Sequence, residues 1–175
     1  MVIWLIGLSG AGKSTLAEAL YARLKPTCSN LVLLDGDVVR ELFGSDADHT
    51  VAGRLINARR LSHLSRMLDR QGIHIIAAVL SIFPEWQAWN REQFSNYHEI
   101  FLDIPMEILK KRDTKGLYKG AAAGTIPNVV GVDIPFPRPP QPDLVVDDVC
   151  QAQGVDHCLE QILASLPTFA DKCEK

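Results

Sequence analysis

The sequence predicts an α/β domain in which a five-stranded parallel sheet is covered by helices on both faces. Short apolar runs of strand length alternate along the chain with segments of helical periodicity, the order expected of βα repeats. Glycine or polar residues stand at the ends of three of these runs, at Gly7, at Asp35 with Asp37, and at Ser81. Because the carboxyl ends of parallel strands meet at one edge of the sheet, these residues should gather there. A chain of 175 residues suits one such core, so we expect a single domain over 1–175.

The individual elements are expected in a regular order. Residues 2–6 form a continuous apolar run, typical of a central strand buried on both faces. A helix then begins within the glycine-rich stretch, with Leu16, Leu20 and Leu24 at four-residue spacing, and stops before Pro26. The other strands are expected at 31–34, 73–79, 98–102 and 144–146, and the other helices at 50–71, 105–112 and 155–166.

The helix over 50–71 is expected to turn one apolar stripe toward the core and its arginines mostly outward, with Gly72 as its C-terminal cap. The inward positions of this stripe are Leu55, Ala58, Leu61, Leu64 and Leu68.

The stretch from 113 to 143 lacks periodicity and is rich in Gly, Ala and Pro. Long excursions of this kind in compact enzymes are often lids, so we expect a lid at about 113–138. A passive surface loop is the alternative reading.

Composition and charge exclude several classes of protein. Hydrophobic residues make up 47% and charged residues 22%, which is ordinary for a globular chain. A net charge of -3 argues against an extended nucleic-acid surface. No apolar run approaches the roughly 18 residues that a membrane span needs, so we expect no membrane partner and a cytoplasmic location. The cysteines lack the spacing of zinc ligands and are expected to be reduced: Cys28, Cys150, Cys158 and Cys173.

A phosphate-binding loop carries the clearest chemical signal. The string GLSGAGKST at 7–15 matches GxxxxGK[ST] and lies between a predicted strand and a predicted helix, the context that the motif requires. Its glycines let backbone N–H groups turn toward phosphates, Lys13 should reach the β- and γ-phosphates of ATP, and the Ser14 hydroxyl should ligate Mg²⁺. The expected ATP-binding residues of this loop are Gly7, Ser9, Gly10, Ala11, Gly12, Lys13, Ser14 and Thr15.

Two carboxylates follow the second predicted strand. Asp35 and Asp37 would lie near the phosphates, where one could take a proton from an acceptor hydroxyl. The alternative is a turn with an aspartate that caps a helix before Val38. A GTPase is not expected, because the nearest string to its guanine-reading element, at 114–117, lacks the required aspartate.

Together, several strings resemble the adenylylsulfate kinase family, over most of the chain. They are GLSGAGKST at 7–15, LDGDVVR at 34–40, NARR at 57–60, Ser81, RDTKGLYKG at 112–120 and GVDIPF at 131–136. The resemblance implies a three-layer P-loop kinase fold and an ATP- and Mg²⁺-dependent kinase. In that family the phosphoryl group goes to the 3′-hydroxyl of adenosine 5′-phosphosulfate, and members are often homodimers.

The resemblance also implies roles for individual residues. Asp37 is the implied base, with Lys13 and, as a weaker choice, Lys115 also catalytic, and Arg112 is implied at the ATP. The acceptor's anionic group suits two arginines. The implied acceptor-binding residues are Asp35, Arg40, His49, Arg54, Asn57, Ser81, Lys115, Gly116, Leu117 and Val129.

The chain departs from the family pattern on the acceptor side. Two phenylalanines that sandwich the acceptor's adenine in the family are replaced here, at His49 and Val129, and Ser-Ile-Phe at 81–83 stands for Ser-Pro-Tyr. Loss of aromatic stacking, worth roughly 1–3 kcal/mol per base, should change base recognition. These changes fit a branch that resembles cytidine diphosphoramidate kinase, so both acceptors stay open. A non-catalytic nucleotide-binding subunit and a simple nucleotide hydrolase are the remaining alternatives.

Overall fold

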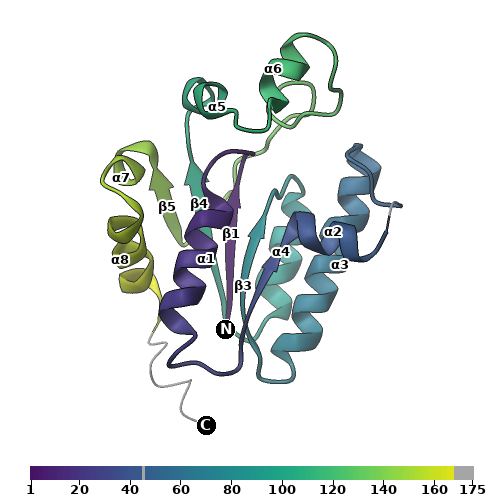
Figure 1. The fold of residues 1–175 in the computed structure, drawn as a ribbon. Helices are drawn as coiled ribbons and strands as arrows, with labels where there is room; N and C mark the ends of the chain where they lie inside the picture. The colour runs from purple at the N-terminus through teal and green to yellow at the C-terminus, as the bar shows by residue number, and fades with distance from the viewer. Residues whose placement is uncertain (45, 168–175) are drawn as a thin grey trace.

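A five-stranded parallel sheet forms the centre of the protein, as predicted (Figure 1). The structure is a computed structural model that describes residues 1–44 and 46–167. The strands lie in the order β2-β3-β1-β4-β5 and all neighbours are parallel. Their bounds are Val2–Gly7 for β1, Leu31–Asp35 for β2, His74–Val79 for β3, Tyr97–Asp103 for β4 and Leu144–Asp147 for β5.

Two separate apolar clusters explain why helices cover both faces of the sheet. Successive side chains of a strand point to opposite faces, and β1 divides in this way between the clusters. Ile3 and Leu5 pack with α1 (Lys13–Leu24) and α8 (Val155–Ser165). Val2, Trp4 and Ile6 belong to the other cluster, with residues of α2 (Gly36–Leu42) and α3 (Val51–Asp69). The predicted three layers are therefore present.

The predicted inward face of α3 is partly wrong. Leu55 is 39% exposed, while the buried stripe runs at four-residue spacing through Gly53, Asn57, Leu61, Ser65 and Asp69. Polar residues can occupy this stripe because the fold supplies partners for some of them: the Asp69 carboxylate accepts hydrogen bonds from the backbone N–H and the hydroxyl of Ser95, both at 2.8 Å. Small and polar residues therefore determine which face of α3 is buried as much as leucines do.

The other predicted helices are present with shifted ends, and Gly72 adopts a left-handed φ of 74° just beyond α3. Four helices had not been given bounds from the sequence: α2, α4 (Pro84–Gln93), α6 (Leu117–Ala122) and α7 (Asp148–Ala152). Three of these are seven residues or shorter, so hydrophobic periodicity has little length over which to act.

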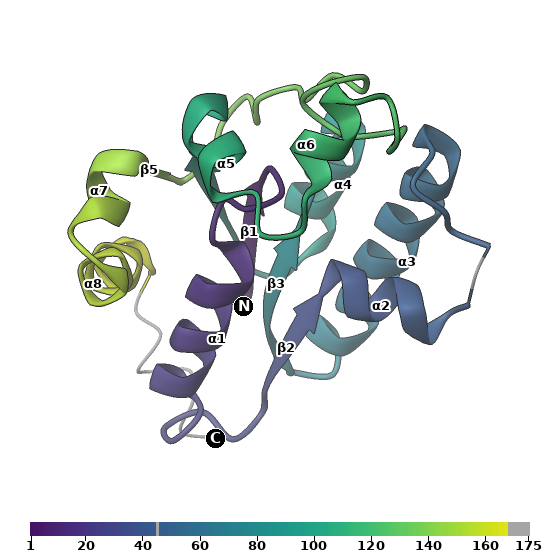
Figure 2. The ribbon, with the colours of Figure 1, turned by 45° about the horizontal axis from the view of Figure 1, so that its top comes forward.

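The segment from 113 to 138 lies above the carboxyl ends of the strands, where it joins α5 (Met106–Arg112) to the return path toward β5 (Figures 1 and 2). It is not wholly irregular, because α6 lies within it and Val130 forms an isolated bridge with Ile134. This position sets it over the phosphate-binding loop at the end of β1.

Two simpler expectations concern membranes and cysteines. Within the described part of the chain, no helix is long and apolar enough to cross a membrane. Cys150 and Cys158 are free and buried and Cys28 is buried as well, whereas Cys173 lies outside the described residues.

Candidate active site

The phosphate-binding loop has the backbone geometry that its sequence predicts. Gly10 and Gly12 have φ values of 77° and 88°, a left-handed region that side chains other than glycine rarely adopt. Gly12 caps α1 without a side chain, so the first N–H groups of the helix face outward from the end of β1. At Gly7 a Cβ atom would approach the Leu102 carbonyl oxygen to 3.0 Å, a tight contact that a glycine avoids where the loop leaves the sheet.

Lys13 follows directly, as the first residue of α1. Its ammonium group donates to the Leu8 carbonyl oxygen at 2.8 Å, within the same loop. Burial lowers the pKa of Lys13 to about 8, although the carboxylates of Asp37 and Asp35 oppose this shift. With this pKa the ammonium is still mostly charged at neutral pH, and together with the N–H groups at the helix start it suits the binding of a polyphosphate.

Asp35 links the loop to the second strand and to α2. Its carboxylate accepts from the Ser14 hydroxyl at 2.8 Å and from the backbone N–H of Asp37 at 2.8 Å. The second contact caps α2, so the helix-cap reading of this string is correct for Asp35. It also leaves the Asp37 side chain 67% exposed at the edge of the site. One aspartate thus positions the other.

The segment above the strands contacts this centre at several points. Lys115 approaches the Asp37 carboxylate, with 3.4 Å between Nζ and Oδ2. The Tyr118 hydroxyl donates to the Ser9 carbonyl oxygen at 2.8 Å, and the Tyr118 ring is buried. Gly116 adopts a left-handed φ of 65° and Leu117 begins α6. This turn places Tyr118 next to the phosphate-binding loop. The string predicted as a lid therefore touches the phosphate loop and the DGD turn.

A small pocket of about 160 Å³ lies beside the start of α1. Arg112 borders it and donates to the Gln151 amide oxygen at 2.8 Å. The Gln151 amide nitrogen donates to the Ala11 carbonyl oxygen at 2.7 Å. The remaining lining residues are Gly12, Thr15, Leu16, Gly154, Val155 and Cys158. Arg112 and Thr15, both predicted at the ATP, therefore share one pocket.

The predicted acceptor arginines form a second group, on α2 and α3. Arg54 donates from Nε to the His49 carbonyl oxygen and from Nη2 to the Asn128 carbonyl oxygen, each at 2.9 Å. Burial, and then the nearby Arg40 charge, lower the pKa of Arg54. Burial likewise lowers the pKa of His49, and the same arginines add to the effect. Such mutual repulsion among cations favours an anion between them.

Arg40 has a structural task as well. Its Nη1 atom donates to the carbonyl oxygens of Ala47 at 2.7 Å and of Asp48 at 2.5 Å. These bonds hold the loop between α2 and α3, the loop that also carries His49. Part of the guanidinium predicted for the acceptor is therefore occupied by the protein's own backbone.

Asn57 and Ser81 lie deeper than the arginines. Asn57 is 6% exposed and donates to the Gly36 carbonyl oxygen at 2.9 Å, which fixes α3 against the DGD turn. The Asn57 amide oxygen is buried and has no hydrogen-bond partner among the described residues. The Ser81 hydroxyl accepts from the Gln87 amide at 3.1 Å, so α4 orients it.

Val129 differs from the other predicted acceptor residues. It is 1% exposed and packs in the main apolar cluster, so its side chain does not face the site. Its neighbour Val130 instead forms a small cluster with Ile82 and Ile134, against which Phe83 packs. The residues at 82–83, which depart from the family pattern, thus pack together with Val130.

Comparison with known proteins gives a consistent result. Residues 1–147 match the family model described as adenylylsulphate kinase. The chain belongs to the adenylylsulfate kinase family.

The chain is similar in sequence to kinases of two kinds. The cytidine diphosphoramidate kinase of Campylobacter jejuni is 41% identical over 94% of this chain and 95% of its own length. The adenylyl-sulfate kinase of Paraburkholderia xenovorans is 39% identical over 93% and 92%. Among solved structures, the APS kinase of Mycobacterium tuberculosis in complex with AMPPNP and APS has a TM-score of 0.84 and 32% identity, covering 94% of this chain and 95% of its own. Shikimate kinase from Aquifex aeolicus, at 20% identity and a TM-score of 0.57, shares the fold.

As a member of a kinase family, the chain is a phosphotransferase with an alcohol group as acceptor. Sequence reasoning did not single out Gln151, although it contacts the phosphate loop, nor Gln87, although it holds Ser81. Neither residue belongs to a recognised motif, and each lies on a helix that the sequence did not predict. Their positions just after β5 and β3 were the available signal, since residues there reach the same edge of the sheet.

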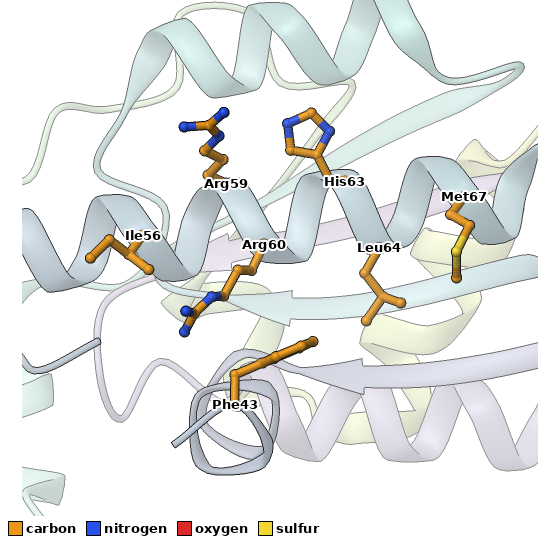
Figure 3. A pocket seen from close by; sticks show the side chains of 7 residues that line it. All are labelled: Phe43, Ile56, Arg59, Arg60, His63, Leu64 and Met67. Carbon is orange, nitrogen blue, oxygen red and sulfur yellow. The ribbon is translucent and has the colours of Figure 1, made fainter. Parts of the chain in front are cut away.

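A separate hollow of about 630 Å³ lies on the outer side of α3, where Phe43, the residue directly after α2, faces it (Figure 3). Its lining residues are Phe43, Ile56, Arg59, Arg60, His63, Leu64 and Met67. None of these residues is among those predicted for catalysis or substrate binding. The hollow is therefore separate from the residues that the sequence predicts for catalysis and for substrate binding.

Proposed function

We propose that the protein is an ATP-dependent kinase that transfers the γ-phosphoryl group to a ribose 3′-hydroxyl of a small nucleotide, adenosine 5′-phosphosulfate. The observation that carries this proposal is the direct link between the two halves of the site. The phosphate loop and the DGD turn are joined by the Ser14–Asp35 hydrogen bond, which brings the exposed Asp37 carboxylate to the phosphate-binding side. A donor site and a candidate base thus share one edge of the sheet.

The oxygen atoms at this edge fit Mg²⁺. The Ser14 hydroxyl and the Asp35 carboxylate are hard oxygen donors 2.8 Å apart, beside Lys13. In the described residues, no group of three or more His, Cys, Asp or Glu could form a metal cage of its own. This supports the usual arrangement in which protein oxygens share the ion with phosphates and water. When bound, Mg²⁺ would neutralise charge on the transferring phosphate.

Asp37 would take the proton from the acceptor hydroxyl as the new oxygen–phosphorus bond forms and ADP leaves. Its exposure and its position next to Lys115 support this role. Arg54 and Arg40, which repel each other, would bind the anionic 5′ group of the acceptor. Lys13 would bind the β- and γ-phosphates.

The segment from 113 to 138 would act as the lid. Its contacts to Ser9 and Asp37, and that of Arg54 to Asn128, support a closed position over both substrates. Closure would exclude water and so suppress hydrolysis of ATP without an acceptor. ATP and a small nucleotide are the expected partners, and a homodimer stays a prediction.

A second candidate acceptor is cytidine diphosphoramidate. It is supported by the 41% identity to the Campylobacter jejuni enzyme. It is also supported by the acceptor side of the site, where Ile82, Val130 and Ile134 form an aliphatic cluster. This buried cluster would support the acceptor side with aliphatic packing in place of the aromatic sandwich of the family pattern.

Steady-state kinetics with both acceptors test the proposal. We expect ADP release that depends on acceptor, with a kcat/KM for adenosine 5′-phosphosulfate at least about tenfold above that for the cytidine compound. The reverse preference would assign the second candidate. As a matched control, Asp37→Asn should retain ATP binding and lose at least about 10²-fold in transfer.

Two outcomes would contradict the proposal as a whole. ATP binding without turnover on either acceptor would favour a non-catalytic subunit, and turnover that no acceptor stimulates would favour a hydrolase. Undiminished transfer by the Asp37→Asn variant would remove that residue as the base.

A further inference from the structure

Gln151 connects two parts of the donor site that are far apart in the sequence. It lies on the short helix α7, which begins at the Asp147 cap after β5. Its amide nitrogen donates to the Ala11 carbonyl oxygen at 2.7 Å, and its amide oxygen accepts from Arg112 Nη1 at 2.8 Å. Because a carbonyl can only accept and a guanidinium can only donate, these two partners fix which end of the amide faces which way.

The bond to Ala11 fixes a peptide plane within the phosphate loop. In a trans peptide the carbonyl oxygen and the following N–H point in opposite directions. While Gln151 holds the Ala11 carbonyl on its own side, the Gly12 N–H must point away from it. This N–H belongs to the start of α1, where backbone donors face bound phosphates.

A tether is needed at this point because the loop is intrinsically free to rotate. Gly12 has a φ of 88° and lacks a Cβ, so the peptide before it meets little steric resistance to reorientation. A Cβ at Gly12 would lie 3.2 Å from the Gln151 amide nitrogen. The absence of a side chain at Gly12 therefore leaves space for the Gln151 amide, and the Gln151 amide in turn restrains the peptide before Gly12.

The second bond, to Arg112, sets one wall of the small pocket. Arg112 is exposed and otherwise approaches only the Gly10 carbonyl oxygen, at 3.5 Å, among the described residues. Gln151 holds the guanidinium at the rim of the pocket, across which Leu16 and Val155 supply apolar surface. A pocket of about 160 Å³ is too small for a whole nucleotide, since typical ligand pockets exceed about 300 Å³. It suits one flat ring system, on which a guanidinium can stack.

We propose that Gln151 is a positioning residue of the donor site, which orients the Ala11–Gly12 peptide for the phosphates of ATP and Arg112 for its base. The inference rests on the proposed function, because it assigns the nucleotide donor to this loop. Gln151 itself acts through the backbone and through Arg112. It accordingly controls the affinity for the donor and leaves the acceptor site unchanged.

The test uses Gln151→Met, which keeps the length of the side chain and removes both hydrogen bonds. We expect the Kd for ATP and the KM for ATP to rise about tenfold or more, with kcat and the KM for the acceptor within about twofold of the wild type. Gln153→Met is the matched control: Gln153 is exposed, two positions along the chain, and should leave all four constants unchanged. Thermal unfolding without nucleotide checks that each variant folds.

Two further measurements separate the two bonds. Tripolyphosphate alone should bind more weakly to Gln151→Met but equally well to Arg112→Ala, because only the first change frees the Ala11–Gly12 peptide. Gln151→Glu keeps an acceptor for Arg112 and loses the donor to Ala11, so it should also weaken tripolyphosphate binding. This variant preserves a polar side chain if the methionine variant fails to fold.

The outcomes are distinct from those for the proposed function. A wild-type protein that does not bind ATP would overturn both proposals. A wild-type protein that binds ATP, together with a folded Gln151→Met variant of equal affinity, would overturn only the role of Gln151. Equal rises in the KM for ATP and for the acceptor would also overturn it, since they would indicate a general structural effect.

Discussion

Lys13 shows how a single buried charge can make nucleotide binding depend on pH. The pKa of its ammonium is about 8 in the folded chain, with burial as the main cause. Bound phosphates would favour the charged form, so the pKa would be higher in the complex than in the free protein. Between these two pKa values the complex holds more protons than the free protein. Affinity for ATP is therefore greatest below pH 8 and falls as the pH rises through this value.

We expect the Kd for ATP to rise between about pH 7.5 and about pH 9.5, by up to about tenfold per pH unit above the pKa of the free protein. Calorimetric titrations in buffers of different ionisation enthalpy should show proton uptake on binding. The Lys13→Arg variant is the control, because an arginine stays charged throughout this range and its profile should be flat. A flat profile for the wild type would contradict the lowered pKa.

Other single residues were predictable to different degrees. The loop residues Gly10, Gly12 and Lys13 could be read from their motif, because a left-handed backbone and a phosphate cradle need those residue types. The hydrogen bonds from Arg40 to the carbonyl oxygens of Ala47 and Asp48 could not be predicted from the sequence. A sequence does not indicate which carbonyl groups of a loop need a side-chain donor.

At the scale of elements, α6 depends on one hydroxyl group for a direct bond to the phosphate loop. Tyr118 is 3% exposed and donates to the Ser9 carbonyl oxygen at 2.8 Å. The ring supplies packing and the hydroxyl supplies the link, so the two contributions can be separated by substitution. Loss of one such hydrogen bond, with the carbonyl left in place, costs about 1–2 kcal/mol.

Tyr118→Phe should loosen the proposed lid without unfolding the chain. We expect ATP hydrolysis in the absence of acceptor to rise about threefold or more relative to transfer, because water is excluded less well. Hydrogen exchange at 114–124 should also become faster. Tyr21→Phe on α1 is the control, since the structure shows no hydrogen bond for that hydroxyl within the described ranges. An unchanged hydrolysis ratio would argue that α6 does not exclude water.

Elements also show where periodicity fails. The strands were predictable because β1 and β3 consist of residues that are all buried. The orientation of α3 was not, because its buried stripe contains Gly53, Asn57 and Asp69, whose partners come from loops and from α2. Helix α7 contains only five residues, which is too short for hydrophobic periodicity to indicate that Gln151 faces the phosphate loop.

At the scale of the whole molecule, the order of the strands determines which segments meet at the site. Strand β1 lies between β3 and β4, so the phosphate loop emerges at the middle of the sheet. The sequence predicted the class of sheet and the gathering of Asp35, Asp37 and Ser81 at its edge. It did not predict that the aliphatic residues Ile82 and Val130 would join into one wall, because they lie on different loops.

The central place of β1 has a consequence for how the protein acquires its activity. Val2 pairs with both Ile75 and Tyr97, partners far along the chain, and such non-local pairings form late in folding. Gly7, where the phosphate loop begins, pairs with Leu102 of β4, so the start of the loop is anchored only when these two strands pair. In refolding experiments on a variant that carries phenylalanine at Trp86 and Trp89, ATP binding should therefore return together with the fluorescence change of Trp4, which is buried in β1, and not in an earlier phase. Binding that precedes this change would show that the loop and α1 can form by themselves.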